Sequence, residues 1–325
     1  MFLQKNITEV ITIQPITHSD KMKSIVNLAK RVAPYPTTVL ISGETGVGKE
    51  VLASYIHQNS ERASHNFVKV NCGAIPESLL DSELFGYEPG AFTGARREGS
   101  QGLFEAANHG TILLDEISEL PPKAQSKLLR ALQEREVRRV GGTWSKNIDV
   151  RVLAATNQNL KELVEKKLFR KDLFYRLQVV QIEIPPLRER PEDIEALIKH
   201  FLINLSKEFN LKRYIDLELI ERLKSYQWPG NVRELRNLVE SLLVTVEKEV
   251  IKTEDIPVYL QESLEQTKVS NKETMPLKEV VDNAERQAIV NTLKFCKDTH
   301  SAAEVLGINY TTLMRKIKKL QIEKT

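Results

Sequence analysis

The chain has 325 residues and a mass of 37.1 kDa, enough for two or three domains with complete hydrophobic cores. Hydrophobic residues make up 41% and charged residues 28%, which excludes disordered and collagen-like chains. No apolar run approaches the roughly 18 residues of a membrane span, and the first 15 residues do not resemble a secretory signal. Because Cys72 and Cys296 have no metal-binding spacing, we expect a reduced, cytoplasmic protein in which Cys72 is a small buried side chain.

The net charge of +3 is unevenly distributed along the chain. Residues 276–325 hold 9 Lys+Arg and 6 Asp+Glu, which leaves 38 of each kind in the rest of the sequence. The whole excess therefore lies in the last 50 residues, where we expect a nucleic-acid partner to bind.

Short β-branched runs separated by helical patterns predict a parallel sheet covered on both faces. The expected strands are Thr37–Ser42, Phe67–Asn71, Thr111–Asp115, Asp149–Ala155 and Val179–Ile184. The expected helices between them include Met22–Ala33, Lys49–Asn59 and Pro122–Glu134.

After Pro185-Pro186 we expect no further strands. An all-helical unit is predicted there, with helices at Pro191–Ser206, Leu217–Tyr226 and Asn231–Glu247. A polar stretch from Gln261 to Met275 is interpreted as a linker, and residues 276–325 as a final helical unit.

A glycine-rich loop follows the first predicted strand and opens a helix. Its residues are Gly43, Glu44, Thr45, Gly46, Val47, Gly48, Lys49 and Glu50. Glycines let backbone N–H groups wrap a phosphate, the helix N-terminus adds partial positive charge, and Lys49 can reach the outer phosphates. Glu50 stands where a Ser or Thr commonly helps to hold Mg²⁺. The alternative is a chance glycine-rich turn.

The third predicted strand ends in two carboxylates, Asp115 and Glu116. Both are expected at the C-terminal edge of the sheet beside the glycine-rich loop, where ligands bind in open α/β sheets. Asp115, with Glu116 beside it, would hold Mg²⁺, and Glu116 would polarise an attacking water. The alternative is an ordinary strand that ends in exposed acids.

Two arginines could supply positive charge to a transferred phosphate. Arg170 and Arg176 are six residues apart, so on one continuous helix they would not share a face. If both act on one phosphate, the helix must break between them or one must act elsewhere. The alternative is a pair of solvated arginines on an amphipathic helix.

The hexapeptide Gly90-Ala91-Phe92-Thr93-Gly94-Ala95 resembles the GAFTGA signature of bacterial enhancer-binding proteins, the AAA+ ATPases that activate sigma-54 RNA polymerase. The flanking segments ELFG, GTILLDE, FRKDLFYRL, IPPLRERPEDI and WPGNVREL occur in the family's order. The resemblance covers about residues 18–260, with a separate match near the C-terminus. The lysine-glutamate pair that ends the glycine-rich loop is typical of this family.

This resemblance implies an AAA+ P-loop ATPase that uses ATP and Mg²⁺. The implied parts are a segment 1–17, an α/β subdomain 18–185, a helical lid 186–260, a linker 261–275 and a helix-turn-helix domain 276–325. By position, Asn71 is similar to the switch residue that orients Glu116, Asn157 to the γ-phosphate sensor, and Arg233 to the second sensor. Arg170 and Arg176 resemble arginines supplied in trans by a neighbouring subunit, which implies a ring, usually a hexamer. A second loop is similar at residues 136–142.

In the GAFTGA segment, glycines at both ends give a flexible tip, and Phe92 presents an apolar side chain that suggests a partner surface. The hypothesis is that the nucleotide state raises or lowers this loop against sigma-54. The alternative is a phenylalanine packed in the protein's own core.

The final unit has the pattern of a helix-turn-helix. Ser301 and Glu304 fit a capping box that starts one helix, Gly307 makes the turn, and a second helix runs from about Tyr310 to Leu320. The candidate DNA contacts on the second helix are Thr311, Thr312, Arg315, Lys316, Lys318 and Lys319. The unit resembles a Fis-type domain, which implies dimerisation through a long helix at Leu277–Phe295, although Gln321 replaces the usual glycine. A solvated amphipathic helix is the alternative.

The sequence as a whole predicts an enhancer-binding, ATP-driven activator of sigma-54 polymerase. Its alternatives are a DNA-binding repressor that retains the ATPase fold, and a different AAA+ machine such as a clamp loader or unfoldase adaptor. Since only about 18 residues precede the resemblance, we expect a regulator that acts in trans or a longer natural chain.

Overall fold

The computed structural model of the chain describes residues 14–91, 98–258, 260–262, 264, 277–296 and 298–320. The chain divides into two compact units, residues 1–264 and 265–325, and each is described by itself. No helix in the described ranges has the length and apolar character needed to cross a bilayer.

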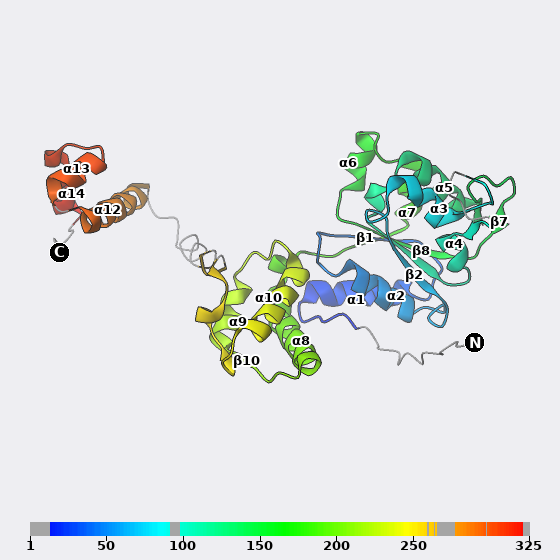
Figure 1. Cartoon of the computed structure of the whole chain (residues 1–325), viewed down its shortest axis with the longest axis horizontal. Coiled ribbons are helices and arrows are strands. Elements are labelled where there is room, and N and C mark those ends of the chain that lie inside the picture. The colour runs from blue at the N-terminus through cyan, green and yellow to red at the C-terminus, as the bar shows by residue number, and fades with distance from the viewer. Residues whose placement is uncertain are drawn as a thin grey trace. The chain divides into compact units, whose positions relative to one another are not determined.

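The first unit is built on a five-stranded parallel sheet with the order β2-β5-β8-β1-β9 (Figure 1). The strands are β1 (Val39–Ser42), β2 (Phe67–Asn71), β5 (Thr111–Asp115), β8 (Arg151–Thr156) and β9 (Val180–Glu183). All five predicted strands are present. β8 begins two residues later than predicted, because the carbonyl and carboxylate of Asp149 accept hydrogen bonds from Arg62 at 2.9 and 2.6 Å.

Side-chain alternation along the strands builds two cores. In β5, Ile112 and Leu114 point into one core while Leu113 points into the other. One face of the sheet packs against α1 (Asp20–Val32) and α2 (Lys49–Gln58). The other face packs against α3 (Glu77–Phe85), α4 (Leu103–Ala106), α5 (Pro122–Gln133), α6 (Leu160–Glu165) and α7 (Lys171–Leu177). The predicted parallel sheet with helices on both faces is confirmed.

Two short antiparallel pairs lie beyond this sheet. β3 (Gly86–Tyr87) pairs with β4 (Ser100–Gln101), and β6 (Glu136–Val137) pairs with β7 (Lys146–Asn147). We call residues 88–99, between β3 and β4, loop 1, and residues 138–145, between β6 and β7, loop 2. Loop 1 contains the GAFTGA segment, of which Phe92, Thr93, Gly94 and Ala95 lie outside the described residues.

The lid consists of α8 (Glu192–Phe209), α9 (Leu217–Lys224) and α10 (Asn231–Thr245), packed around the fully buried Trp228. It is not all-helical as predicted, because β10 (Tyr214–Ile215) and β11 (Val250–Ile251) form a parallel pair. The buried Ile251 explains the difference, since it brings the chain after α10 back into the lid core.

The lid also extends past its predicted end at residue 260. The described residues 260–262 and 264 are helical, and the side chains of Leu260 and Leu264 are buried in the lid core. Because both side chains are buried in the same core, the predicted linker does not begin at Gln261. Residues 263 and 265–276 lie outside the described ranges.

The second unit contains α12 (Leu277–Phe295), α13 (Thr299–Val305) and α14 (Tyr310–Lys319), as the predicted helix-turn-helix requires. Its small core contains Ile289, Leu313 and Ile317. The predicted N-cap at Ser301 is wrong. The carboxylate of Asp298 accepts hydrogen bonds from the N–H groups of His300 at 2.9 Å and Ser301 at 2.8 Å, so the helix begins earlier.

Candidate functional site

The glycine-rich loop joins β1 to α2 at the C-terminal edge of the sheet (Figure 1). Gly46 and Gly48 have φ of 81° and 107°, in the left-handed region that glycine adopts without strain. Lys49 is 8% exposed, and its Nζ donates hydrogen bonds to the carbonyls of Gly43 at 2.7 Å and Glu44 at 3.0 Å. Burial lowers the pKa of Lys49 from its ordinary value. The loop therefore holds a buried amine against neutral carbonyl oxygens.

The last residue of the loop points to a different partner. The carboxylate of Glu50 pairs with Lys69 on β2 at 2.8 Å, and both side chains are well exposed. Glu50 is therefore engaged in a surface ion pair.

Asp115 and Glu116 lie where β5 ends, close enough that their charges act on the pKa of Lys49. Asp115 Oδ1 accepts a hydrogen bond from the N–H of Glu116 at 2.9 Å. Glu116 has a φ of 54°, an uncommon conformation for a residue with a side chain. This turn ends the strand abruptly, and the structure thus brings the two predicted carboxylates and Lys49 into one site.

Gly73 separates Asn71 from Glu116. Asn71 Oδ1 accepts hydrogen bonds from the N–H groups of Gly73 at 2.9 Å and Ala74 at 3.0 Å. A Cβ atom on Gly73 would lie 3.5 Å from Asn71 Oδ1 and would collide with Glu116 Oε2. The position of the Glu116 carboxylate therefore requires a residue without a side chain at Gly73, a requirement that the strand and loop motifs do not reveal.

The two predicted sensor residues contact the loop from two different elements, the end of β8 and the lid helix α10. Asn157, just after β8, donates a hydrogen bond from Nδ2 to Thr45 Oγ1 at 3.1 Å. The N–H of Arg233, on the lid helix α10, donates to the carbonyl of Gly46 at 3.3 Å, and its charge also lowers the pKa of Lys49. A cavity of about 410 Å³ lies beside the loop, and its lining includes Gly43, Glu44, Thr156, Asn157, Gln158 and Glu183.

Arg170 and Arg176 do not belong to one continuous helix. Arg170 is the N-cap of α7 with an extended backbone, whereas Arg176 is in its last turn. The guanidinium of Arg170 pairs with Asp172 at 2.7 Å, which raises the pKa of Arg170, and also donates to Ser126 Oγ at 3.0 Å. Arg176 donates to the carbonyl of Leu132 at 2.8 Å. The expectation that the two arginines lie on different faces of one helix therefore does not apply, because only Arg176 belongs to α7.

Loop 2 is joined by backbone hydrogen bonds to the base of loop 1. The N–H of Glu88 donates to the carbonyl of Val140 at 3.0 Å, and the N–H of Val140 donates to that of Gly86 at 2.9 Å. A Cβ atom on Gly141 would lie 3.0 Å from the Cβ of Ala91. The two loops therefore meet with almost no space between them.

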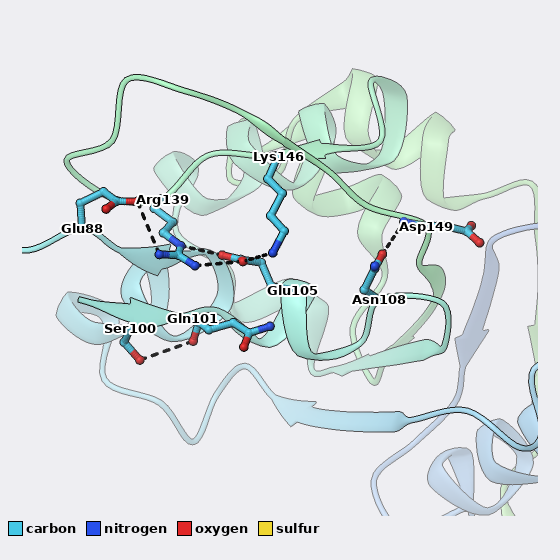
Figure 2. A network of polar contacts seen from close by, with 8 residues as sticks. All are labelled: Glu88, Ser100, Gln101, Glu105, Asn108, Arg139, Lys146 and Asp149. Carbon is cyan, nitrogen blue, oxygen red and sulfur yellow. Dashed lines mark hydrogen bonds and ion pairs between the residues drawn. The ribbon is translucent and has the colours of Figure 1, made fainter. Parts of the chain in front are cut away.

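A buried carboxylate anchors this junction (Figure 2). Glu105 on α4 is 4% exposed and accepts hydrogen bonds from Arg139 at 2.7 and 3.0 Å and from Lys146 at 2.8 Å. Arg139 also pairs with Glu88 of loop 1 at 3.5 Å. Burial raises the pKa of Glu105, but the hydrogen bonds and charges of its two cations outweigh it and lower the pKa overall.

Comparison with known proteins accounts for nearly the whole chain. Residues 15–183 match the sigma-54 interaction domain, residues 188–273 an AAA+ ATPase lid domain, and residues 274–323 a helix-turn-helix domain. The chain belongs to the sigma-54 interaction domain family.

Relatives of this sigma-54 family include longer proteins. The chain is 47% identical to a signal-transduction and transcriptional-control protein of Clostridium beijerinckii, with 95% of this chain and 48% of that protein covered. It is 44% identical to the regulatory protein AtoC of Escherichia coli, with 95% and 68% covered. The crystal structure of NtrX from Brucella abortus in complex with ATP has a TM-score of 0.70 and 32% identity, and covers 95% and 69% of the two chains. The chain thus spans only about half the length of the Clostridium relative.

The residues of this sigma-54 domain fit a nucleoside triphosphate and Mg²⁺. The glycine loop, the N-terminus of α2 and the Lys49 amine form a positive cradle for phosphates. Asp115 and Glu116, at the end of β5 and near Lys49, offer carboxylate oxygens that would hold Mg²⁺ together with the phosphates. Cys72 is buried and its pKa is raised to about 12, mainly by burial, so it carries no reactive thiolate.

The predicted DNA-contacting residues fall into two groups on α14. Thr311, Arg315, Lys318 and Lys319 are exposed, and Thr312 and Lys316 are half-buried. Lys316 pairs with Glu285 at 2.5 Å and Lys319 with Asp282 at 2.8 Å, both on α12. Two of the candidate lysines therefore hold α14 against α12 within the same unit.

Several residues that organise these sites were not found from the sequence. They are Gly73, Glu105, Lys146, Trp144, Arg188 and Asn231. Trp144 in loop 2 is 52% exposed, with the guanidinium of Arg139 5.8 Å from its ring centroid. The sequence does contain a signal for this site, because it places a tryptophan beside a predicted partner-binding loop, where a large apolar side chain suggests a partner surface.

Proposed function

We propose that this protein is a cytoplasmic ATP-driven transcription activator that binds enhancer DNA and remodels the sigma-54 RNA polymerase closed complex. The observation that carries the proposal is the GAFTGA segment, which begins at Gly90-Ala91 in the domain that also holds the Lys49, Asp115 and Glu116 site. ATP hydrolysis supplies the energy, and loop 1 delivers it to the partner.

In the proposed reaction, the glycine loop and Lys49 bind the phosphates, and Asp115 holds Mg²⁺. When bound, Mg²⁺ neutralises charge on the phosphate oxygens. Glu116 polarises the attacking water and accepts its proton, and Asn71 controls the position of that carboxylate. Asn157 and Arg233 sense the nucleotide from the sheet and from the lid, in keeping with their contacts to Thr45 and Gly46.

The proposed active unit is a ring, with a hexamer as the expected form. Arg170 and Arg176 act on the nucleotide of the neighbouring subunit. This role is supported by the position of Arg170, which lies outside helix α7 and has a half-exposed side chain. Both arginines would exchange their present partners, Asp172 and the carbonyl of Leu132, for phosphate oxygens.

Loop 1 is proposed to contact sigma-54 through Gly90, Ala91, Phe92, Thr93, Gly94 and Ala95. The backbone bonds between Glu88 and Val140 support a coupled movement of loops 1 and 2. The second unit binds double-stranded enhancer DNA through α14, and α12 is the proposed dimerisation helix.

The deciding experiment measures open-complex formation by purified sigma-54 RNA polymerase with ATP. Thr93→Ala is expected to keep ATPase activity and DNA binding but to lose activation. Glu116→Gln is the matched control, because it should bind ATP and lose both hydrolysis and activation. Activation by Thr93→Ala equal to that of the wild type would remove the role of loop 1, and repression by an active wild-type ATPase would favour a repressor.

A further inference from the structure

The segment that joins the sheet to the lid contacts the glycine-rich loop from outside. The guanidinium of Arg188 donates two hydrogen bonds to the carboxylate of Glu44, at 2.9 and 2.6 Å. Asn231, which is fully buried, donates to the same carboxylate and to the carbonyl of Thr45, both at 3.1 Å. Hydrogen bonds from Arg188 and Asn231 lower the pKa of Glu44 to about 2. Glu44 is thus an ionised group that is bonded to the lid.

Asn231 is itself held in place. Its Oδ1 accepts a hydrogen bond from the N–H of Leu187 at 2.8 Å, and its φ is 54°. One asparagine side chain therefore connects the joining segment, at Leu187, with the loop, at Thr45.

The lid also binds the next two carbonyls of the loop. The carbonyl of Gly46 accepts hydrogen bonds from the N–H groups of Val232 at 3.0 Å and Arg233 at 3.3 Å. The carbonyl of Val47 accepts one from Arg190 at 2.8 Å. Arg190 is 2% exposed and lies 3.8 Å from the buried carboxylate of Asp193. Three successive carbonyls, from Thr45 to Val47, are thus directed at lid residues.

These bonds fix the direction of the loop's amide groups. In a trans peptide the N–H of the following residue points away from the carbonyl. With the carbonyls of Thr45, Gly46 and Val47 turned to the lid, the N–H groups of the residues that follow them point to the opposite side. Phosphate oxygens are bound by N–H groups of this kind, so the lid orients the donors before nucleotide arrives.

We propose that Glu44, Arg188 and Asn231 form a latch that positions the glycine-rich loop for ATP and makes ATP affinity depend on the lid. The inference rests on the proposed ATPase function. These are positioning residues that act through backbone N–H groups. The latch is expected to govern nucleotide affinity more than the rate of the chemical step.

The test compares Arg188→Met, Glu44→Gln and the double variant in the full chain. A fluorescent ATP analogue measures nucleotide affinity directly, and steady-state ATPase assays give KM and kcat. Each single variant is expected to weaken affinity and raise KM about tenfold, with kcat within about twofold of the wild type. The double variant should bind the analogue no more weakly than either single variant, because each single change already removes the ion pair between Arg188 and Glu44.

Lys199→Met is the matched control, because Lys199 forms an exposed ion pair with Glu195 on α8 at 2.7 Å, within the lid alone. It should leave affinity, KM and kcat unchanged. An unchanged affinity in both latch variants, additive losses in the double variant, or a fall in kcat alone would each overturn the latch. If the wild type binds the analogue but does not activate polymerase, the proposed function fails and the latch is still measured.

Discussion

We call the predicted phosphate site around Lys49 the nucleotide edge, and the contacts around Glu105 that join loops 1 and 2 the loop junction. These two regions use buried charge in opposite ways. At the nucleotide edge, Lys49 donates hydrogen bonds to two neutral carbonyls, and no ion pair to it is found among the described residues. At the loop junction, Arg139 and Lys146 both bind the buried carboxylate of Glu105. A cation held by neutral carbonyls remains available to bind an incoming anion. Cations that are paired with a buried carboxylate instead stabilise the fold.

Replacing one lysine at each edge tests this contrast most strongly. Lys49→Ala is expected to lower ATP affinity by about 100-fold or more, since it removes the charge that meets the phosphates. Lys146→Ala should keep ATP affinity and lower the free energy of unfolding by about 1 kcal/mol, because the lysine is half-exposed and Arg139 still holds Glu105. Nucleotide titration and urea unfolding of both variants provide the measurement. Equal effects of the two changes on ATP affinity would refute the contrast.

A second test changes the shape of the nucleotide edge and leaves its charges intact. Gly73→Ala places a Cβ against the Glu116 carboxylate, which must then move. We expect kcat for ATP hydrolysis to fall about 100-fold with nucleotide affinity preserved, since a small displacement of a catalytic group has an effect of that size. A kcat near the wild-type value in Gly73→Ala would show that Glu116 needs no such space.

A third test titrates the loop junction. The pKa of Glu105 is lowered in the folded protein, so its ionised form adds stability that is complete above the ordinary glutamate pKa of about 4.3. That contribution must disappear as the pH falls through the folded-state pKa. Glu105→Gln should therefore cost about 2 to 3 kcal/mol at pH 7 and progressively less in acid, which urea unfolding at several pH values measures. A pH-independent difference would mean that packing and not charge holds the junction.

Local patterns predicted the framework better than they predicted its contacts. β5 is a short run of consecutive buried apolar residues between turn signals, so Ile112, Leu113 and Leu114 are recognised as strand residues from the sequence pattern alone. The bond between Arg139 and Glu105 joins residues 34 apart, and the bonds from Arg188 and Asn231 to Glu44 join residues 144 and 187 apart. No local pattern specifies which distant side chain completes such a pair.

Competition between local signals explains the errors. Asp298 and Ser301 could both cap α13, and the charged carboxylate prevailed over the hydroxyl three residues later. The pairing of β10 with β11 involves two residues from each strand, too few to leave a periodic pattern. A single helix that contains both Arg170 and Arg176 is one of the predicted alternatives, but α7 begins after Arg170, which is the usual uncertainty at helix ends.

The smallest expected effect separates the two groups of cations on α14, which repeat the same contrast in the second unit. Arg315, Lys318 and Lys319 are exposed and Lys316 is half-buried, but Lys316 and Lys319 differ from the other two in that they pair with acids of α12. Arg315→Ala and Lys318→Ala are each expected to weaken enhancer binding about tenfold and to reduce the slope of log affinity against log salt by about 1, since each removes a phosphate contact. Lys316→Ala and Lys319→Ala should weaken binding only about twofold and leave the slope nearly unchanged, because those lysines are already paired with carboxylates of α12. Gel-shift titrations at several salt concentrations measure both quantities, and equal salt slopes for the two groups would show that the ion pairs to α12 open when DNA binds.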